Sequence, residues 1–175
     1  MKAGKKRRPT SDAVEVLHGR YYEGKPERLA NLVYFDAVVP TDGQSEYDAD
    51  PNVAGRHAAE REAEEAGTPG FQPVPVDYLR TRVPDKGDLE WLLAKMVPHP
   101  IATFSQPLHL RNPAAESIPR TFVFCTKGKE SGFQTIQTSK QLQQDPRWRY
   151  RELAANHLAP VNAPGETADL LLSLI

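Results

Sequence analysis

Several features that define other protein classes are scarce or absent in this chain of 175 residues. Its one cysteine, Cys125, excludes an internal disulfide and favours a reducing compartment. No run of about 18 apolar residues and no apolar core of a signal peptide is present, so no membrane association is expected. The net charge is -1, with 22 basic and 23 acidic residues, which does not favour a nucleic-acid partner. These absences predict a soluble cytoplasmic protein.

The N-terminal segment, residues 1–25, differs from the rest of the chain. Its first eight residues include five lysines and arginines without apolar periodicity, which predicts disorder. Such a run binds a polyanion or serves as an address signal in some proteins, and is a solvated tail in others. Gly19 and Gly24 interrupt the short apolar pattern that follows. We therefore expect residues 1–25 to be disordered or divergent.

Three short segments predict β-strands. Residues 32–35 (LVYF) and 119–126 (PRTFVFCT) are nearly continuous apolar runs, typical of strands covered on both faces. Residues 148–153 (WRYREL) alternate with a period of two. Helical patterns at residues 133–144 and from Pro164 onward follow the second and third segments. Strands joined by helices indicate an α/β fold with a parallel sheet.

Residues 41–112 separate the first two strands and contain no convincing strand of their own. Residues 52–66 are rich in alanine and charge and predict an exposed helix, and residues 87–97 place leucines at helical spacing. The proline-rich residues 69–80 are expected to be extended, and residues 98–110 to form a short helix and a loop. We expect residues 41–112 to be a helical cap, or lid, on the side of the sheet where ligands bind.

Two polar residues directly follow predicted strands. Ligands and catalytic groups in open α/β sheets gather at the carboxyl ends of the strands. His157 lies just beyond residues 148–153, and Asp36 ends residues 32–35. His157 is therefore a candidate for chemistry or a surface-loop histidine without a task. Asp36 is either a cap on the next turn or a functional acid.

The other polar and aromatic residues support weaker expectations. Trp91, Phe104 and Leu108, with Tyr47, are candidates to line a pocket for a small ester or hydrophobic ligand, or they form the core of the lid. The remaining histidines lack partners at ligand spacing, so neither a metal nor a cofactor is expected. Cys125 is predicted to be buried and inert. The segment containing Lys127, Lys129 and Glu130 is expected to be a solvated turn.

Several of these segments together resemble the α/β-hydrolase superfamily, in its esterase-like branch related to plant methylesterases and hydroxynitrile lyases. They are PERLANLVYFDAVVPTDGQS, ATFSQPL, PRTFVFCT and WRYRELAANHLAPVNAPGETADLLLSL, and the resemblance covers about residues 26–175. It implies a partial α/β-hydrolase fold, in which a three-stranded parallel sheet remnant comes from residues 26–40 and 113–175. Residues 41–112 would be the helical cap of that fold.

The resemblance also implies roles for the two candidate residues. His157 matches the catalytic histidine of the family, although the usual Gly-His-Asp is replaced here by Asn156-His157-Leu158. Plant methylesterases carry their catalytic aspartate soon after the Cys-Thr strand end, where this chain has no carboxylate before Glu130. Other branches, the haloalkane dehalogenases among them, place the acid where this chain has Asp36. Asp36 is the favoured acid and Glu130 the alternative.

The nucleophile motif of the family, G-x-S-x-G, is absent from the sequence. Ser11 and Asp12 lie near the expected position, but neither has flanking glycines or a preceding apolar strand. The resemblance thus implies the C-terminal half of a carboxylic ester hydrolase, whose N-terminal end has been lost, replaced or supplied by another chain. A non-catalytic protein that binds small molecules or depends on a partner is the alternative. The strand at residues 32–36 is then expected to have an open edge that recruits a second copy or a complementing chain.

Overall fold

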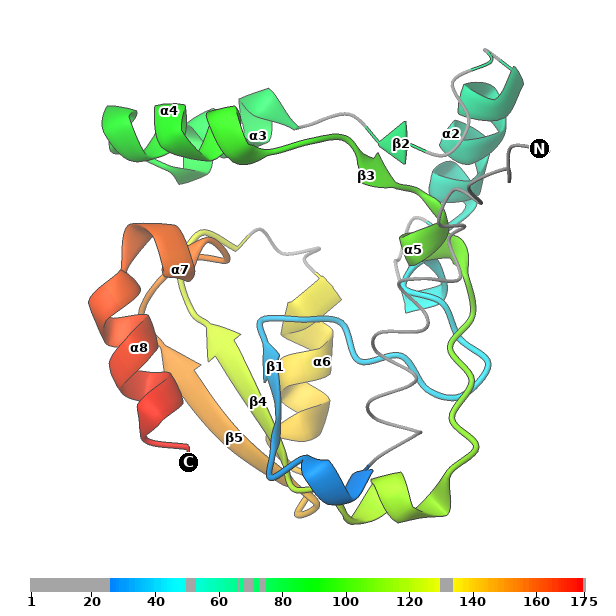
Figure 1. Ribbon diagram of the computed structural model, residues 1–175, viewed down its shortest axis with the longest axis vertical. Coiled ribbons are helices and arrows are strands. Elements are labelled where there is room, and N and C mark those ends of the chain that lie inside the picture. Colours follow the sequence, from blue (N-terminus) through cyan, green and yellow to red (C-terminus); the bar gives the residue numbers. More distant parts are fainter. Residues whose placement is uncertain are drawn as a thin grey trace, which may run out of the picture.

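A three-stranded parallel sheet is the centre of the computed structural model, which describes residues 26–49, 53–65, 67, 71–72, 75–129 and 134–174. The sheet has the order β1-β4-β5, formed by Leu32–Phe35, Arg120–Cys125 and Trp148–Leu153 (Figure 1). All three predicted strands and their parallel arrangement are therefore confirmed. The expectations for residues 1–25 lie outside the described residues.

The burial of the strands explains why their sequences differ. β4 is the central strand, and its Phe122, Val123 and Cys125 are fully buried, as expected for a strand covered on both faces. β5 lies at the edge of the described sheet, and its first residues alternate between half-buried and exposed. The period of two in residues 148–153 reflects this edge position.

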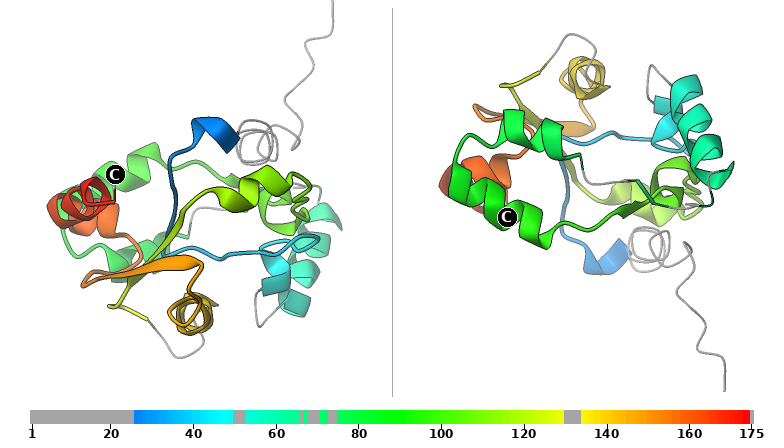
Figure 2. Two further views of the ribbon diagram at one scale, coloured as in Figure 1. Left: turned by 90° about the horizontal axis from the view of Figure 1, so that it is seen from below. Right: turned by 90° about the horizontal axis from the view of Figure 1, so that it is seen from above.

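Helices cover both faces of the sheet. α6, Gln134–Leu142, connects β4 to β5 and packs on one face, where Ser139 Oγ lies 2.7 Å from the hydroxyl of Tyr150 (Figures 1 and 2). α8, Pro164–Leu172, packs on the opposite face, after the single-turn helix α7, Ala159–Asn162. Both longer helices confirm the sequence prediction. α7 was not predicted; Pro160 lies in its first turn, where no backbone N–H is needed.

The insert, residues 41–112, begins and ends with paired backbone. Gly43 N donates to the carbonyl of Leu108, and Leu108 N donates to the carbonyl of Gln44. Between these ends, α3 and α4 lie above the carboxyl ends of the strands, and α2 and α5 lie to one side (Figure 1). The elements, with the helix that follows the insert, are η2 Tyr47–Ala49, α2 Val53–Glu65, β2 Phe71–Gln72, α3 Val76–Arg82, α4 Lys86–Lys95, β3 His99–Pro100, α5 Ala102–Ser105 and η3 Pro113–Ser117.

Two predictions for the insert were wrong. Residues 76–80 were expected to be extended but belong to α3, because the prolines stop at Pro75, just before the helix, and Leu79 and Val83 are buried one helical turn apart. No strand was expected, yet β2 and β3 form a two-residue antiparallel pair. In the described ranges, no helix combines the length and the apolar character needed to cross a membrane.

Candidate functional site

Asp36 lies at the carboxyl end of β1 and is fully buried. Its N–H still donates to the carbonyl of Val123, 2.7 Å away, so it continues the pairing of β1 with β4. Its φ of 49° is in the left-handed region, which aspartate tolerates better than most residues but which is uncommon outside glycine. Strained backbone of this kind is concentrated at functional sites. The carboxylate lies at this end of the sheet, within hydrogen-bond distance of Lys129 in the loop after β4 and of His157 in the loop after β5.

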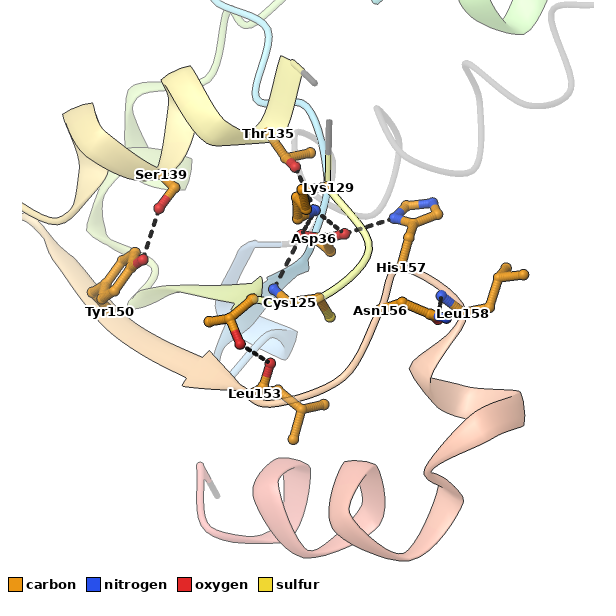
Figure 3. Close-up of polar contacts among 11 residues, drawn as sticks. Asp36, Cys125, Lys129, Thr135, Ser139, Tyr150, Leu153, Asn156, His157 and Leu158 are labelled. Atoms are coloured by element: carbon orange, nitrogen blue, oxygen red, sulfur yellow. Dashed lines mark hydrogen bonds and ion pairs between the residues drawn. The ribbon is translucent and has the colours of Figure 1, made fainter. Parts of the chain in front are cut away.

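His157 reaches this carboxylate from the loop after β5. Its Nδ1 lies 2.8 Å from Oδ2 of Asp36 (Figure 3). An ionised carboxylate can only accept a hydrogen bond, so Nδ1 donates and carries the proton in the neutral imidazole. The side chain of His157 is 42% exposed, and Nε2 is on the side of the ring away from Asp36. The predicted meeting of these two residues at one rim of the sheet is observed.

Lys129 completes a group of three charged or ionisable side chains. The prediction of a solvated turn was wrong for this residue, whereas Lys127 is exposed as expected and Glu130 lies outside the described residues. Its side chain is only 6% exposed, and its Nζ lies 2.6 Å from both carboxylate oxygens of Asp36. Nζ also donates to Oγ1 of Thr135 at 2.7 Å and lies 5.0 Å from the centre of the Phe124 ring. The sequence signal for this contact was weak, because the lysine lies 93 residues from its partner in a Lys-Gly-Lys turn.

The surroundings of Asp36 keep it ionised. Burial raises the pKa of this carboxyl, but hydrogen bonds from His157 and Lys129, the charge of Lys129 and the backbone N–H of Cys125 lower it more. The net result is a pKa below the ordinary value of 3.8. Burial, and then the charge of Asp36, raise the pKa of the Cys125 thiol to about 12. Cys125 is therefore protonated at neutral pH, as its predicted inertness requires.

Asn156 and Asn162 hold the histidine loop against the insert. Nδ2 of each donates to the carbonyl of Arg82, at the end of α3, over 2.8 and 2.9 Å. Oδ1 of Asn156 accepts from the N–H of Leu158 at 2.9 Å and from Nδ2 of Asn162 at 2.7 Å. Asn156, the residue before His157, thus bonds the histidine loop to the insert through its side chain. The glycine that is usual at this position in the family has no side chain to make these bonds.

The other predicted site residues are spread over the insert. Phe104 of α5 stacks on Tyr47, with ring centres 6.0 Å apart, and contacts the ring of His99 at 4.6 Å. Leu108 pairs through its backbone with residues 43 and 44. Trp91 is 57% exposed on α4, which lies at the other end of the insert from α5 (Figures 1 and 2). Their role as a substrate pocket stays a prediction, and Ser11, Asp12 and Glu130 lie outside the described residues.

The arrangement of Asp36 and His157 suits proton transfer. A buried carboxylate that accepts the Nδ1 proton orients an imidazole and leaves Nε2 to accept a proton from a reacting group. Within the described ranges, no three His, Cys, Asp or Glu side chains gather as metal ligands.

Comparison with known proteins gives related folds. No protein-family model matches the sequence. A carbendazim-hydrolysing esterase of Nocardioides sp. (strain SG-4G) is 28% identical in an alignment 180 residues long, which covers 93% of this chain and 71% of the esterase. An extracellular α/β-hydrolase from a Paenibacillus species superposes with a TM-score of 0.66 at 20% identity, covering 91% of this chain and 67% of that one.

A methylesterase from Arabidopsis superposes with a TM-score of 0.63 at 15% identity, covering 91% of this chain and 64% of its own. The chain therefore spans about two thirds of the length of these solved structures. The chain thus has the α/β-hydrolase fold over the part that it shares with these proteins, and it resembles the esterase-like members of that fold.

Proposed function

We propose that this chain provides the base and the acid of a carboxylic ester hydrolase site. The observation that supports the proposal is the 2.8 Å contact between Nδ1 of His157 and the buried carboxylate of Asp36. The esterase and methylesterase names of the similar proteins favour an ester as the substrate class. A small-molecule ester is the proposed ligand, and the cytoplasm the proposed location.

Each residue has a distinct task in this proposal. Nε2 of His157 takes the proton from an attacking hydroxyl as the new bond to the ester carbonyl forms. The same nitrogen then gives that proton to the departing alkoxide when the old ester bond breaks. Asp36 keeps Nδ1 protonated and stabilises the cationic imidazole between these two steps. Lys129 and the N–H of Cys125 hold the carboxylate in place.

The nucleophile is the missing part of the machinery. The 175 residues contain no G-x-S-x-G, the motif that presents a serine on a tight turn beside the oxyanion hole. A base without its nucleophile retains little catalysis. We therefore propose that ester turnover by this chain alone is negligible, and that the insert acts as the lid of a site completed by a complementing chain.

The test compares wild type with His157→Ala on p-nitrophenyl acetate, with free imidazole at equal concentration as the reference. The expected wild-type rate is within about tenfold of the imidazole rate, because an isolated base provides only a small part of enzymatic catalysis. A fluorophosphonate, which labels activated serines, should label no residue. A fast rate that disappears in His157→Ala, together with a labelled serine, would show that this chain has its own nucleophile.

A further inference from the structure

Lys129 is a buried cation in direct contact with the acid of the proposed site. Its ammonium is within 2.6 Å of both oxygens of Asp36, and the side chain is 6% exposed. Removing an ammonium from water is costly unless a partner compensates it, and here one carboxylate provides most of that compensation. The hydroxyl of Thr135 and the face of Phe124 provide the rest. Such a contact constrains where the carboxylate lies and how its charge is shared (Figure 3).

The two oxygens of Asp36 have different partners. Oδ1 accepts from the N–H of Cys125 at 3.1 Å and from Lys129, whereas Oδ2 accepts from Lys129 and from Nδ1 of His157. The oxygen that holds the imidazole is therefore already bonded to a positive charge. Without Lys129, the full negative charge of the Asp36 carboxylate would stabilise the cationic form of His157. A cation beside the pair disfavours a second cation on the imidazole.

We propose that Lys129 is a positioning residue that acts through Asp36: it fixes the orientation of the carboxylate, offsets part of its charge, and so keeps His157 neutral at lower pH than a pair without Lys129. The inference rests on the proposed base role of His157. A base must be neutral to accept a proton, so Lys129 widens the acidic end of the pH range in which the site works.

The groups that face Asp36 come from four elements. Lys129 approaches from the loop after β4 and His157 from the loop after β5, and both lower its pKa. The thiol of Cys125 at the end of β4 stays protonated and adds no charge. Thr135 of α6 is uncharged and contacts Lys129. Lys129 is thus the cation that bonds to both oxygens of Asp36, and His157 bonds to one of them.

The test follows the titration of His157 by long-range proton–nitrogen NMR in the full chain labelled with ¹⁵N at histidine, with the signal assigned by its loss in His157→Gln. In Lys129→Met the midpoint of the titration should rise by about one pH unit. It should stay within about 0.3 unit of wild type in Lys129→Arg, which restores the charge, and in Lys127→Met, which removes an exposed neighbouring lysine. A midpoint that does not rise in Lys129→Met, or that rises equally in either control, overturns the inference.

A second measurement uses the unmodified protein, in case Lys129→Met does not fold by circular dichroism. The Nζ resonance of Lys129 should shift with the same midpoint as the imidazole of His157, because both bond to Oδ2 of Asp36. A resonance that does not respond to the titration of His157 contradicts the inference. Neither experiment requires ester turnover. The p-nitrophenyl acetate assay, which tests the proposed function, and these titrations can therefore succeed or fail separately.

Discussion

Oδ2 of Asp36 lies 2.8 Å from Nδ1 of His157, although 121 residues separate the two in the chain. The parallel sheet brings them together, because β1 and β5 flank β4 and end at the same edge. The insert lies between β1 and β4 in the chain and accounts for much of the sequence distance between Asp36 and His157. It does not part the strands that carry them, because β1 and β4 are neighbours in the sheet. Each prediction below tests one of the contacts that hold this arrangement.

The stability of the fold should depend on the ionisation of Asp36. Its pKa is below 3.8 in the folded chain, so the carboxylate contributes stability that is fully present above about pH 4 and is lost as the pH falls through the lowered value. Asp36→Asn leaves Lys129 without its charged partner and should lose about 3 kcal/mol or more at pH 7. Urea unfolding at pH 7, 4 and 3 measures both effects.

Comparing the pH dependence of stability in wild type and in Asp36→Asn isolates the contribution of Asp36. Asp145, whose pKa is lowered to about 2 mainly by Arg147, titrates in the same acidic range, but it does so in wild type and variant alike. Wild type should therefore lose more stability than Asp36→Asn between pH 4 and 3. Equal losses in both proteins would mean that Asp36 does not contribute in this way.

Asn162 should stabilise the contact between the histidine loop and the insert. Asn162→Ala removes the hydrogen bonds from Nδ2 to Arg82 O and to Oδ1 of Asn156. The expected loss is about 1–2 kcal/mol, with faster hydrogen exchange at the N–H of Leu158, which also bonds to Asn156. Gln141→Ala, at an exposed position of α6, is the control and should change neither quantity. Unchanged exchange at Leu158 would rule out the proposed coupling.

Gly128 should resist substitution because it has a left-handed backbone and lies where the loop after β4 approaches the loop after β5. Its φ is +68°, and an added Cβ would lie 3.1 Å from Cβ of Asn156. Gly128→Ala should cost about 1–2 kcal/mol for the left-handed backbone alone. Gly165→Ala in α8 is the matched control, since nothing lies within 4 Å of its added Cβ and alanine favours a helix by up to about 1 kcal/mol. Thermal unfolding with equal effects for both variants would contradict the assigned strain.

The edge of β1 tests the proposed complementing chain. In the described sheet β1 pairs with β4 alone, and Val33 is 37% exposed. An unpaired apolar strand edge is a template for association, so we expect multi-angle light scattering at tens of micromolar to show species larger than 19.5 kDa. Val33→Lys should reduce that association, because charge on an edge strand opposes pairing. A monomer for wild type at these concentrations would argue against an open edge.

Most of the sheet and the position of both site residues followed from the sequence. The apolar runs of β1 and β4 and the alternation in β5 are strong local signals, and parallel pairing then places Asp36 and His157 at one edge. α3 was missed because the prolines before it suggested extended chain, while burial of Leu79 and Val83 determined the outcome.

Lys129 was missed for a different physical reason. A lysine in a short turn is usually solvated, and its burial here depends on a carboxylate 93 residues away, which no local pattern reveals. The absence of an aspartate after the Cys-Thr strand end was the available signal. Once the acid lies on β1, the loop after β4 is free to present a cation to it.

The tautomer of His157 is the most direct test of the proposed base and acid pair. Long-range proton–nitrogen NMR above the titration of His157 should show the proton on Nδ1 and a bare Nε2 in wild type. In Asp36→Asn the proton should move in part to Nε2, because an amide no longer requires a donor at Nδ1. A wild-type imidazole protonated at Nε2, or one whose tautomer is the same in Asp36→Asn, would contradict the account.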